Sequence, residues 1–545
     1  MIIKEIKDSK LISNVFRSLT RSSPLQVKIT TDDETVVRGE LLFLDRKGTS
    51  PAVSIKDYRL SLNQIILVYY VHKEIIYRFK TPIIDCKDNL YYIEIPCNVT
   101  SLFNRFVPRY KIPEDFKDNY YIEFHSKKDR YILSDISING MRFLSDKKFE
   151  CGEIIKNALL SLDNILNLQV DFKIVYSRKD NDIFINGVNF LNLDLKERNK
   201  LQTFIISSTH PHLNNLLLFE EDKIYNLYDK SGYLSLKDSN EMNRNFMNMI
   251  NNFNNIKRNC YISSHPVYCK DSKLLSTASV IRIYNGTFLA QQLASIPEAR
   301  LNLSSRNEIY LALCEYLLCN PYFEYHLAYF DATLKWHSEM YGYFSSFIND
   351  ESKFLIDTIG LLEYSGFNSK ANPENPEKKY SLAPILEYSE FINYCKNNLE
   401  DIVSNTYYYN EDFFQNQISQ VFDLIGLFMV RRLFGIYKDG VLISYCVCEF
   451  YPDGLNLYNL LDMARFYLLD EYIDLNEMFD DIIPEIAVYY KKYGKTKFNI
   501  LIKSDEETLR SITTKGIKYS HLLGRAFIDR KGLSFYHKLV MLSTR

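Results

Sequence analysis

Short runs typical of β-strands recur between residues 25 and 96, and turn residues separate these runs; in 27–31 apolar and polar residues alternate. A period of two is typical of β-strands that expose one face to solvent. Repeated short strands with turns at roughly every dozen residues predict a small β-barrel, which we place at residues 1–98. The expected strands are 27–31, 35–44, 65–70, 76–84 and 90–95.

A second β-rich block spans residues 99–210. Its strand patterns cover 131–135, 169–177 and 183–190, and the block ends in apolar residues at helical spacing over 195–206. The pattern predicts a second barrel with a C-terminal helix that caps it.

The connecting segment, residues 211–259, is rich in asparagine but keeps a helical stripe. Apolar residues that recur every three or four positions share one face of a helix. We expect a connecting helix, and a disordered linker is the alternative. The stripe consists of Met242, Phe246, Met249, Ile250 and Phe253.

Residues 260–545 mix helical and strand patterns, with aromatic-rich helices expected at 306–318 and 334–348. Glycine and proline make 365–379 a loop and a possible subdivision. A chain of 545 residues exceeds one ordinary core, so several domains are expected. The predicted fold class is multidomain α+β: two N-terminal β-barrels followed by a mixed α/β region.

Charge and composition exclude several classes of protein. The chain has 66 basic and 68 acidic residues, a formal net charge of -2, which argues against a protein that coats DNA. The most apolar run, 421–430, is far shorter than the about 20 residues of a membrane-spanning helix, so no membrane insertion is expected. The start of the chain does not look like a signal peptide. Ten cysteines without a CxxC pair predict no metal site and a reduced, cytoplasmic location.

Two short motifs carry the candidate chemistry: Arg105-x-x-x-Arg109, and Asp135-x-Ser137-x-x-Gly140 further along the chain. Arginine forks bind phosphates or the O6/N7 edge of guanine, and a carboxylate accepts from guanine N1 and N2. A hydroxyl serves either group, and glycine lets the backbone approach closely. Taken singly, the first motif is typical of a solvated or salt-bridged pair and the second of a turn. Together, in this order, they fit the groups of a cyclic dinucleotide.

With these motifs, and with Gly187-Val188-Asn189-Phe190 as a late strand, the segment resembles the PilZ domain family. The upstream barrel, with residues 77–81 and 93–96, resembles the N-terminal domain of YcgR-like proteins. The resemblance covers roughly the first 210 residues.

The resemblance implies that a set of five residues contacts cyclic di-GMP. It also implies that the arginine segment links the two barrels, so that ligand capture reorients them. Asn104 stands where the family often has arginine or a bulky residue, which leaves the ligand stoichiometry open. The five residues are Arg105, Arg109, Asp135, Ser137 and Gly140.

The order of elements across residues 434–502 resembles the core of GNAT acyltransferases. Strands are expected at 434–437, 441–450, 455–461 and 497–502, with a helix at 482–492. In that family a glycine-rich loop at a helix N-terminus holds the coenzyme A pyrophosphate. No glycine occurs between Leu460 and Phe479, so we expect a GNAT-like region without ordinary acetyl-CoA binding.

These patterns predict a cyclic di-GMP receptor whose domains reorient and pass the signal to a C-terminal output region and a protein partner. No catalytic residue, metal or cofactor is expected. The alternative is an acyltransferase or aminoacyl transferase that cyclic di-GMP regulates.

Overall fold

The computed structural model describes residues 2–7, 9, 12, 16, 25–31, 36–44, 51–55, 58–72, 75–88, 90–103, 109–124, 129–234, 239–256, 261–300, 303–333, 335–367, 378–410, 417–469 and 472–543. Contacts divide the chain into two compact units. One unit comprises Met1–Arg109 with Gly342–Phe354, and the other comprises Tyr110–Tyr341 with Leu355–Arg545. No helix in the described ranges is long and apolar enough to cross a membrane.

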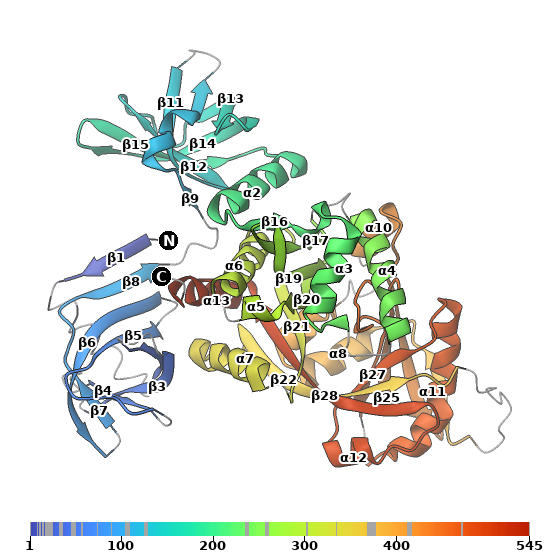
Figure 1. Ribbon diagram of the computed structural model, residues 1–545. Helices are drawn as coiled ribbons and strands as arrows, with labels where there is room; N and C mark the ends of the chain where they lie inside the picture. Colours follow the sequence, from blue (N-terminus) through green and yellow to red (C-terminus); the bar gives the residue numbers. More distant parts are fainter. Residues whose placement is uncertain are drawn as a thin grey trace. The chain divides into compact units, whose positions relative to one another are not determined.

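The first unit contains an eight-stranded sheet in the order β1-β8-β6-β5-β2-β3-β4-β7 (Figure 1). Strand β6 also pairs with β7, so six strands close into a ring. Alternate residues such as Val27, Ile29 and Val68 fill its core. The five strands expected from these runs are confirmed. The strands are β1 (Ile2–Ile6), β2 (Leu25–Thr30), β3 (Val36–Phe43), β4 (Pro51–Ser54), β5 (Ile65–His72), β6 (Ile75–Lys87), β7 (Leu90–Ile93) and β8 (Val99–Phe103).

A second sheet, in the other unit, has the order β10-β13-β14-β15-β12-β11-β9, and β10 also pairs with β11. Aromatic rings fill its interior: Phe124, Tyr131 and Phe143 pack against Phe149. The expected strands and the helix that follows them are confirmed. The elements are β9 (Tyr110–Lys111), the short 3-10 helix η2 (Glu114–Asn119), β10 (Tyr120–Phe124), β11 (Asp129–Ser137), β12 (Gly140–Ser145), β13 (Ile154–Leu162), β14 (Leu166–Asp180), β15 (Ile183–Phe190) and α2 (Leu195–Thr209).

The connecting segment is helical. Helix α4 (Ser239–Ile256) follows α3 (Glu221–Lys230), and its apolar stripe is buried. The stripe packs in one large core with α3 and with strands of the third sheet. A connecting helix was therefore the correct alternative for the described part of this segment.

The third sheet has thirteen strands and belongs to the second unit. Its order is β16-β18-β19-β20-β21-β28-β22-β27-β26-β25-β24-β23, and β17 pairs with β19. The mixed α+β fold class is confirmed. The strands are β16 (Leu213–Asn215), β17 (Ser263–Ser264), β18 (Pro266–Lys270), β19 (Lys273–Arg282), β20 (Thr287–Ser295), β21 (Tyr325–Asp331), β22 (Phe354–Tyr364), β23 (Tyr380–Pro384), β24 (Val430–Lys438), β25 (Val441–Phe450), β26 (Met463–Leu468), β27 (Phe498–Ile502) and β28 (Ile517–Asp529).

Ten further helical segments accompany this sheet in the described residues. The two aromatic-rich helices expected from the sequence are confirmed as α6 and α7. The helices are η3 (Leu216–Leu218), α5 (Pro297–Arg300), α6 (Leu303–Cys319), α7 (Lys335–Ile348), α8 (Ser389–Asn398), α9 (Asp401–Thr406), α10 (Gln417–Leu424), α11 (Leu475–Lys492), α12 (Glu506–Arg510) and α13 (Arg530–Ser543).

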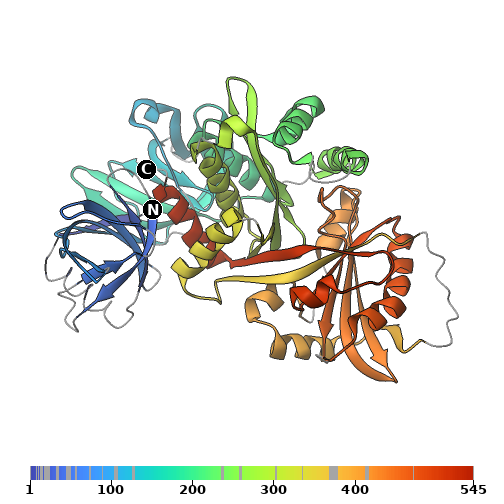
Figure 2. The ribbon, with the colours of Figure 1, turned by 60° about the horizontal axis from the view of Figure 1, so that its bottom comes forward.

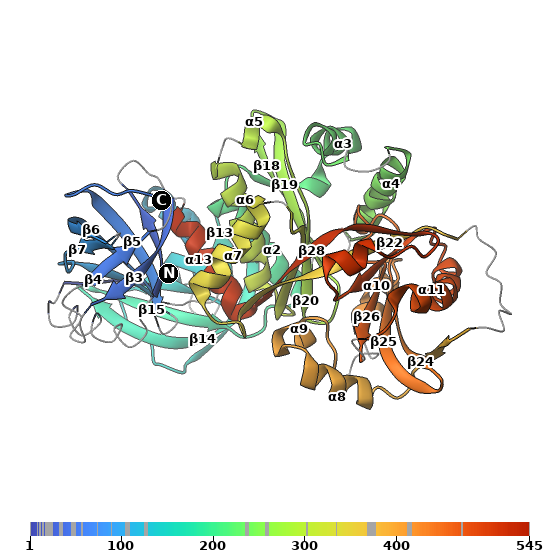
Figure 3. The same cartoon turned by 90° about the horizontal axis from the view of Figure 1, so that it is seen from below.

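The thirteen-stranded sheet contains an internal repeat. Strands β18, β19 and β20, helix α6, strand β21, helix α7 and strand β22 are matched in order by β24, β25, β26, α11, β27, α12 and β28. In each half two strands are parallel and are joined through a helix: β20 with β21, and β26 with β27. Helix α11 packs against the strands of its half (Figure 3).

The last strand of each half is exchanged. Strand β28 pairs with β21 of the first half, and β22 pairs with β27 of the second. Figure 2 shows these two long strands between the halves. The exchange joins both halves into one continuous sheet.

Two expectations for the second half were wrong in detail. Residues 455–461 are not a strand, because the Asn456 side chain accepts from the amides of Tyr458 and Leu460 and holds turns there; the third strand begins at Met463. Helix α11 begins at Leu475, before the expected start, because Asp474 accepts from two amides of its first turn.

Candidate functional site

The Asp135-x-Ser137-x-x-Gly140 motif forms the tight hairpin between β11 and β12. Ser137 pairs with Gly140, and the Ser137 hydroxyl donates to the Gly140 carbonyl over 2.9 Å. A Cβ at position 140 would collide with the backbone carbonyl of Val188 on β15. Glycine is therefore required here by close packing of two strands.

Asp135 is buried and faces a basic partner that the sequence reasoning did not assign to the site. The Arg142 guanidinium, on β12, donates to the carboxylate of Asp135, and the two residues are paired across the strands. Burial lowers the pKa of Arg142, but the Asp135 hydrogen bond and charge outweigh burial and raise it. Arg142 thus stays charged and fixes the orientation of the carboxylate.

Strand β9, which directly follows Arg109 in the sequence, pairs with β11. Lys111 pairs with Asp135, and Tyr110 pairs with Ile136. Arg109 directly precedes β9 in the sequence and is half-buried. Arg105 lies outside the described residues. Of the other expected site residues, Asp135, Ser137 and Gly140 lie on the paired strands β11 and β12.

An exposed tyrosine stands beside this group. Tyr176 on β14 pairs with Gly187 on β15, and Gly187 pairs with Arg142. A Cβ at Gly187 would collide with the Tyr176 ring, so the ring lies directly over the glycine. The ring is 38% exposed and offers an aromatic face next to the Asp135–Arg142 pair.

Helix α2 contacts the turn of the hairpin. Arg198 donates to the Asn139 side chain over 3.2 Å, and Asn139 is one of the two turn residues between β11 and β12. The two residues are far apart in sequence, so local pattern gave no signal for this contact.

Helix α2 is also hydrogen-bonded to α6, one of the helices that accompany the third sheet. Gln202 donates to the Tyr316 carbonyl over 3.0 Å. Just after α2, the His210 imidazole lies 3.1 Å from the buried carboxylate of Glu315, which His537 of α13 approaches to 3.2 Å. His210 and Glu315 are both buried where α2 packs against α6.

Comparisons with known proteins bear on the same region. The PilZ domain profile matches residues 105–207. No curated protein sequence matches the chain significantly. Several solved structures share low similarity with it. The complex of K. pneumonia MrkH with c-di-GMP has 14% identity and a TM-score of 0.20, covering 38% of this chain and 96% of that one.

Two further structures complete the comparison. YcgR from Escherichia coli in complex with c-di-GMP has 14% identity and a TM-score of 0.20, over 38% of this chain and 93% of its own. A tandem GNAT protein from the clavulanic acid biosynthesis pathway has 11% identity and a TM-score of 0.28, over 49% of this chain and 83% of its own. The profile match spans the arginine segment, the β11–β12 hairpin and most of α2, and residues 105–207 therefore belong to the PilZ domain family.

Proposed function

We propose that this protein is a cyclic di-GMP receptor that binds the dinucleotide at its PilZ domain. The observation that carries the proposal is the occurrence of both motifs inside the PilZ match, with Asp135, Ser137 and Gly140 together on the β11–β12 hairpin. The ligand contacts are assigned to Arg105, Arg109, Asp135, Ser137 and Gly140.

Each of these residues has a distinct chemical role in the proposal. The arginine forks grip a phosphate or the O6/N7 edge of guanine. The Asp135 carboxylate, oriented by Arg142, accepts from guanine N1 and N2. The exposed ring of Tyr176 adds a face on which a base can stack.

The signal passes, in this proposal, to the region from residue 260 onward, which we regard as a GNAT-like output region with a downstream protein partner. Helix α2 is the connection, because it contacts the hairpin turn through Arg198 and α6 through Gln202. A ligand that binds one arrangement of the hairpin and α2 more tightly shifts the population toward that arrangement.

Calorimetric titration with cyclic di-GMP tests the binding site. Arg109→Ala and Asp135→Asn are each expected to weaken binding by at least about tenfold, since hydrogen bonds to charged groups contribute about 1.5–3 kcal/mol. Arg178→Ala is the matched control, because Arg178 is an exposed arginine on β14, away from the hairpin. Equal affinity of Arg109→Ala and Arg178→Ala contradicts the assignment.

A further inference from the structure

One buried carboxylate joins three helices of the second unit. Glu315 lies on α6, and one of its oxygens is 3.1 Å from the Nε2 of His210, which directly follows α2. Its other oxygen is 3.2 Å from the Nε2 of His537 on α13. These three residues, the clasp, link the last helix of the PilZ domain to two helices of the C-terminal region.

The clasp is shielded from water. The side chain of Glu315 is 5% exposed, and those of His210 and His537 are 7% and 8% exposed. In such a place the attraction between opposite charges is much stronger than at a surface, and a carboxylate without a charged partner is costly. The clasp therefore holds most firmly when an imidazole carries a proton.

Protonation of His210 is the step that changes the strength of the clasp. Burial lowers the pKa of His210, but the hydrogen bond and charge of Glu315, with the charge of Glu308, outweigh burial and raise it above 6.5. Burial raises the pKa of Glu315, but the two imidazoles outweigh burial and lower it to about 2. The His210–Glu315 contact is therefore strongest below pH 6.5 and weakens as the pH rises through the raised pKa of His210.

Other ionisable groups surround the clasp on the same three helices. Burial raises the pKa of both neighbouring thiols on α6, to about 12 for Cys319, so these thiols stay neutral when His210 titrates. The charge that changes near neutral pH is thus carried by imidazole. The groups are Glu308, Cys314, Glu315 and Cys319 on α6, Arg530, His537 and Lys538 on α13, and Arg198 on α2.

The opposite end of α2 contacts the candidate ligand site. Arg198 donates to the side chain of Asn139 in the turn of the β11–β12 hairpin over 3.2 Å. Gln202, further along the helix, donates to the Tyr316 carbonyl on α6 over 3.0 Å. A helix is a rigid element, so a displacement at its C-terminal end is carried to the hairpin turn.

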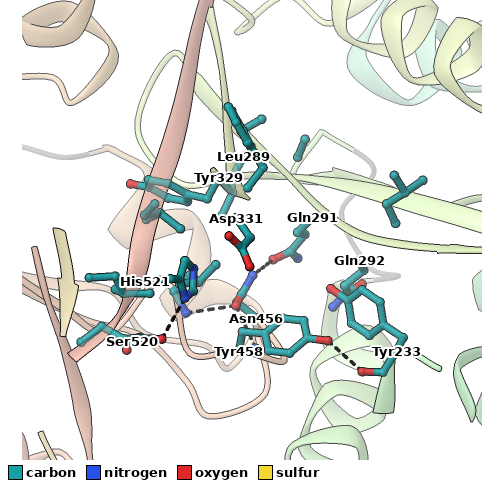
Figure 4. Close-up of a pocket in the computed structure, with 18 of the residues that line it drawn as sticks. Tyr233, Leu289, Gln291, Gln292, Tyr329, Asp331, Asn456, Tyr458, Ser520 and His521 are labelled. Atoms are coloured by element: carbon teal, nitrogen blue, oxygen red, sulfur yellow. Dashed lines mark hydrogen bonds between the residues drawn. The ribbon is translucent and has the colours of Figure 1, made fainter. Parts of the chain in front are cut away.

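The elements on the other side of the clasp form walls of a pocket in the third sheet. Helix α13 directly follows the exchanged strand β28, and Figure 4 shows Ser520 and His521 of this strand in the pocket lining. Tyr310 and Leu313, on the same helix as Glu315, line the same pocket. The clasp thus connects α2 to two elements that shape this part of the C-terminal region.

We propose that the clasp is a proton-sensitive fastener between the PilZ domain and the C-terminal region. With His210 protonated, Glu315 holds the end of α2 on α6 and α13. With His210 neutral, the end of α2 opens more often, and the contact of Arg198 with the hairpin turn loosens with it. As a control on the cyclic di-GMP response this inference rests on the proposed function, whereas the fastener itself does not.

Hydrogen–deuterium exchange of the full chain at pH 6 and pH 8.5, corrected for intrinsic amide exchange, tests the fastener. Protection of the peptides that cover α2 and the β11–β12 hairpin is expected to fall at least about threefold from pH 6 to pH 8.5. Peptides from β25, in the core of the same sheet, are the internal reference and are expected to keep their protection.

Three variants separate the clasp from a general effect of pH. His210→Gln and Glu315→Gln are each expected to abolish the pH dependence of α2 protection, because neither leaves an imidazolium–carboxylate pair at this end of the helix. His212→Gln is the matched control, since His212 is an exposed histidine two residues further on, and it is expected to behave as the wild type. The proposal is overturned if protection of α2 does not change with pH, if His210→Gln keeps the change, or if β25 loses protection to the same extent.

Calorimetric titration with cyclic di-GMP at the same two pH values tests the control on the response. The affinity of the wild type is expected to differ at least about threefold between pH 6 and pH 8.5, and that of His210→Gln to differ less. The same pH dependence in both proteins overturns the control on the response. Absence of binding at both pH values contradicts the proposed function instead, and the exchange data still decide on the fastener.

Discussion

Replacement of Glu315 by glutamine tests how the end of α2 is held to the third sheet. The carboxylate is 4% exposed and accepts from His210, just after α2, and from His537 on α13. Glu315→Gln keeps the shape of the side chain but removes its charge. Both imidazoles then lose a charge-assisted partner in a buried place, so we expect a clear loss of stability.

Two independent arguments give the size of the expected loss of stability in Glu315→Gln. A hydrogen bond to a charged group stabilises the folded protein by roughly 1 kcal/mol more than a neutral one. For the two imidazoles this difference is about 2 kcal/mol. Burial raises the pKa of Glu315, but the hydrogen bonds and charges of His210 and His537 outweigh burial and lower it from 4.5 to about 2. That lowering corresponds to about 3 kcal/mol of stability.

The stability that Glu315 and His210 contribute changes with pH in a defined direction. Because the folded-state pKa of Glu315 is below its unfolded value, its contribution is complete above about pH 4.5 and is lost as the pH falls toward 2. Burial lowers the pKa of His210, but Glu315 outweighs burial and raises it above 6.5. The contribution of His210 is therefore complete below pH 6.5 and is lost as the pH rises through the raised value.

Urea unfolding followed by circular dichroism measures the effect. The free energy of unfolding of the wild type should exceed that of Glu315→Gln by about 2–3 kcal/mol near pH 5.5, and this difference should shrink toward pH 9. Glu387→Gln, which removes an exposed carboxylate, should have the wild-type free energy of unfolding at both pH values. A difference below about 0.5 kcal/mol at pH 5.5, or one that does not change with pH, contradicts the role of Glu315 as the charged partner of the two imidazoles.

Four further substitutions test the packing of the structure. Arg142→Ala leaves the buried Asp135 without this partner, and a loss of about 1–3 kcal/mol should appear in thermal melts; an unchanged melting temperature contradicts the role of Arg142. Gly140→Ala should lower the melting temperature because of the Val188 collision, whereas Gly342→Ala, in the helix α7 with open space around it, should raise stability by up to about 1 kcal/mol; equal effects would be inconsistent with the tight hairpin. Glu449→Ala leaves two buried arginines, Arg431 and Arg465, without their shared carboxylate and should destabilise by about 3–5 kcal/mol in urea titrations; a loss below 1 kcal/mol counts against the buried cluster.

Local periodicity accounts for the elements that the sequence predicted well. The alternation in 27–31 places Val27 and Ile29 in the barrel core, and the stripe from Met242 to Phe253 forms the buried face of α4, so both periods are visible in the sequence. Strand β19 is buried on both faces over its last seven residues, and such a strand shows no alternation. This explains why the first half of the repeat was missed while the second was recognised.

Long-range contacts explain what was missed at the site. Arg142 was placed on a strand by its sequence, but its pairing with Asp135 depends on the register of β11 and β12, which has a bulge at Ser134. The contact of Arg198 with the hairpin and the exchange of β22 and β28 join residues distant in sequence. No local pattern encodes such pairings.

Titration of the intact chain with cyclic di-GMP, compared with cyclic di-AMP under the same conditions, measures whether the protein recognises guanine. The O6 and N2 groups that distinguish guanine from adenine are the groups that the arginines and Asp135 are proposed to read. The account predicts saturable binding of cyclic di-GMP, at least about a hundredfold tighter than that of cyclic di-AMP. Absence of binding by a folded chain, or equal affinity for the two dinucleotides, contradicts it.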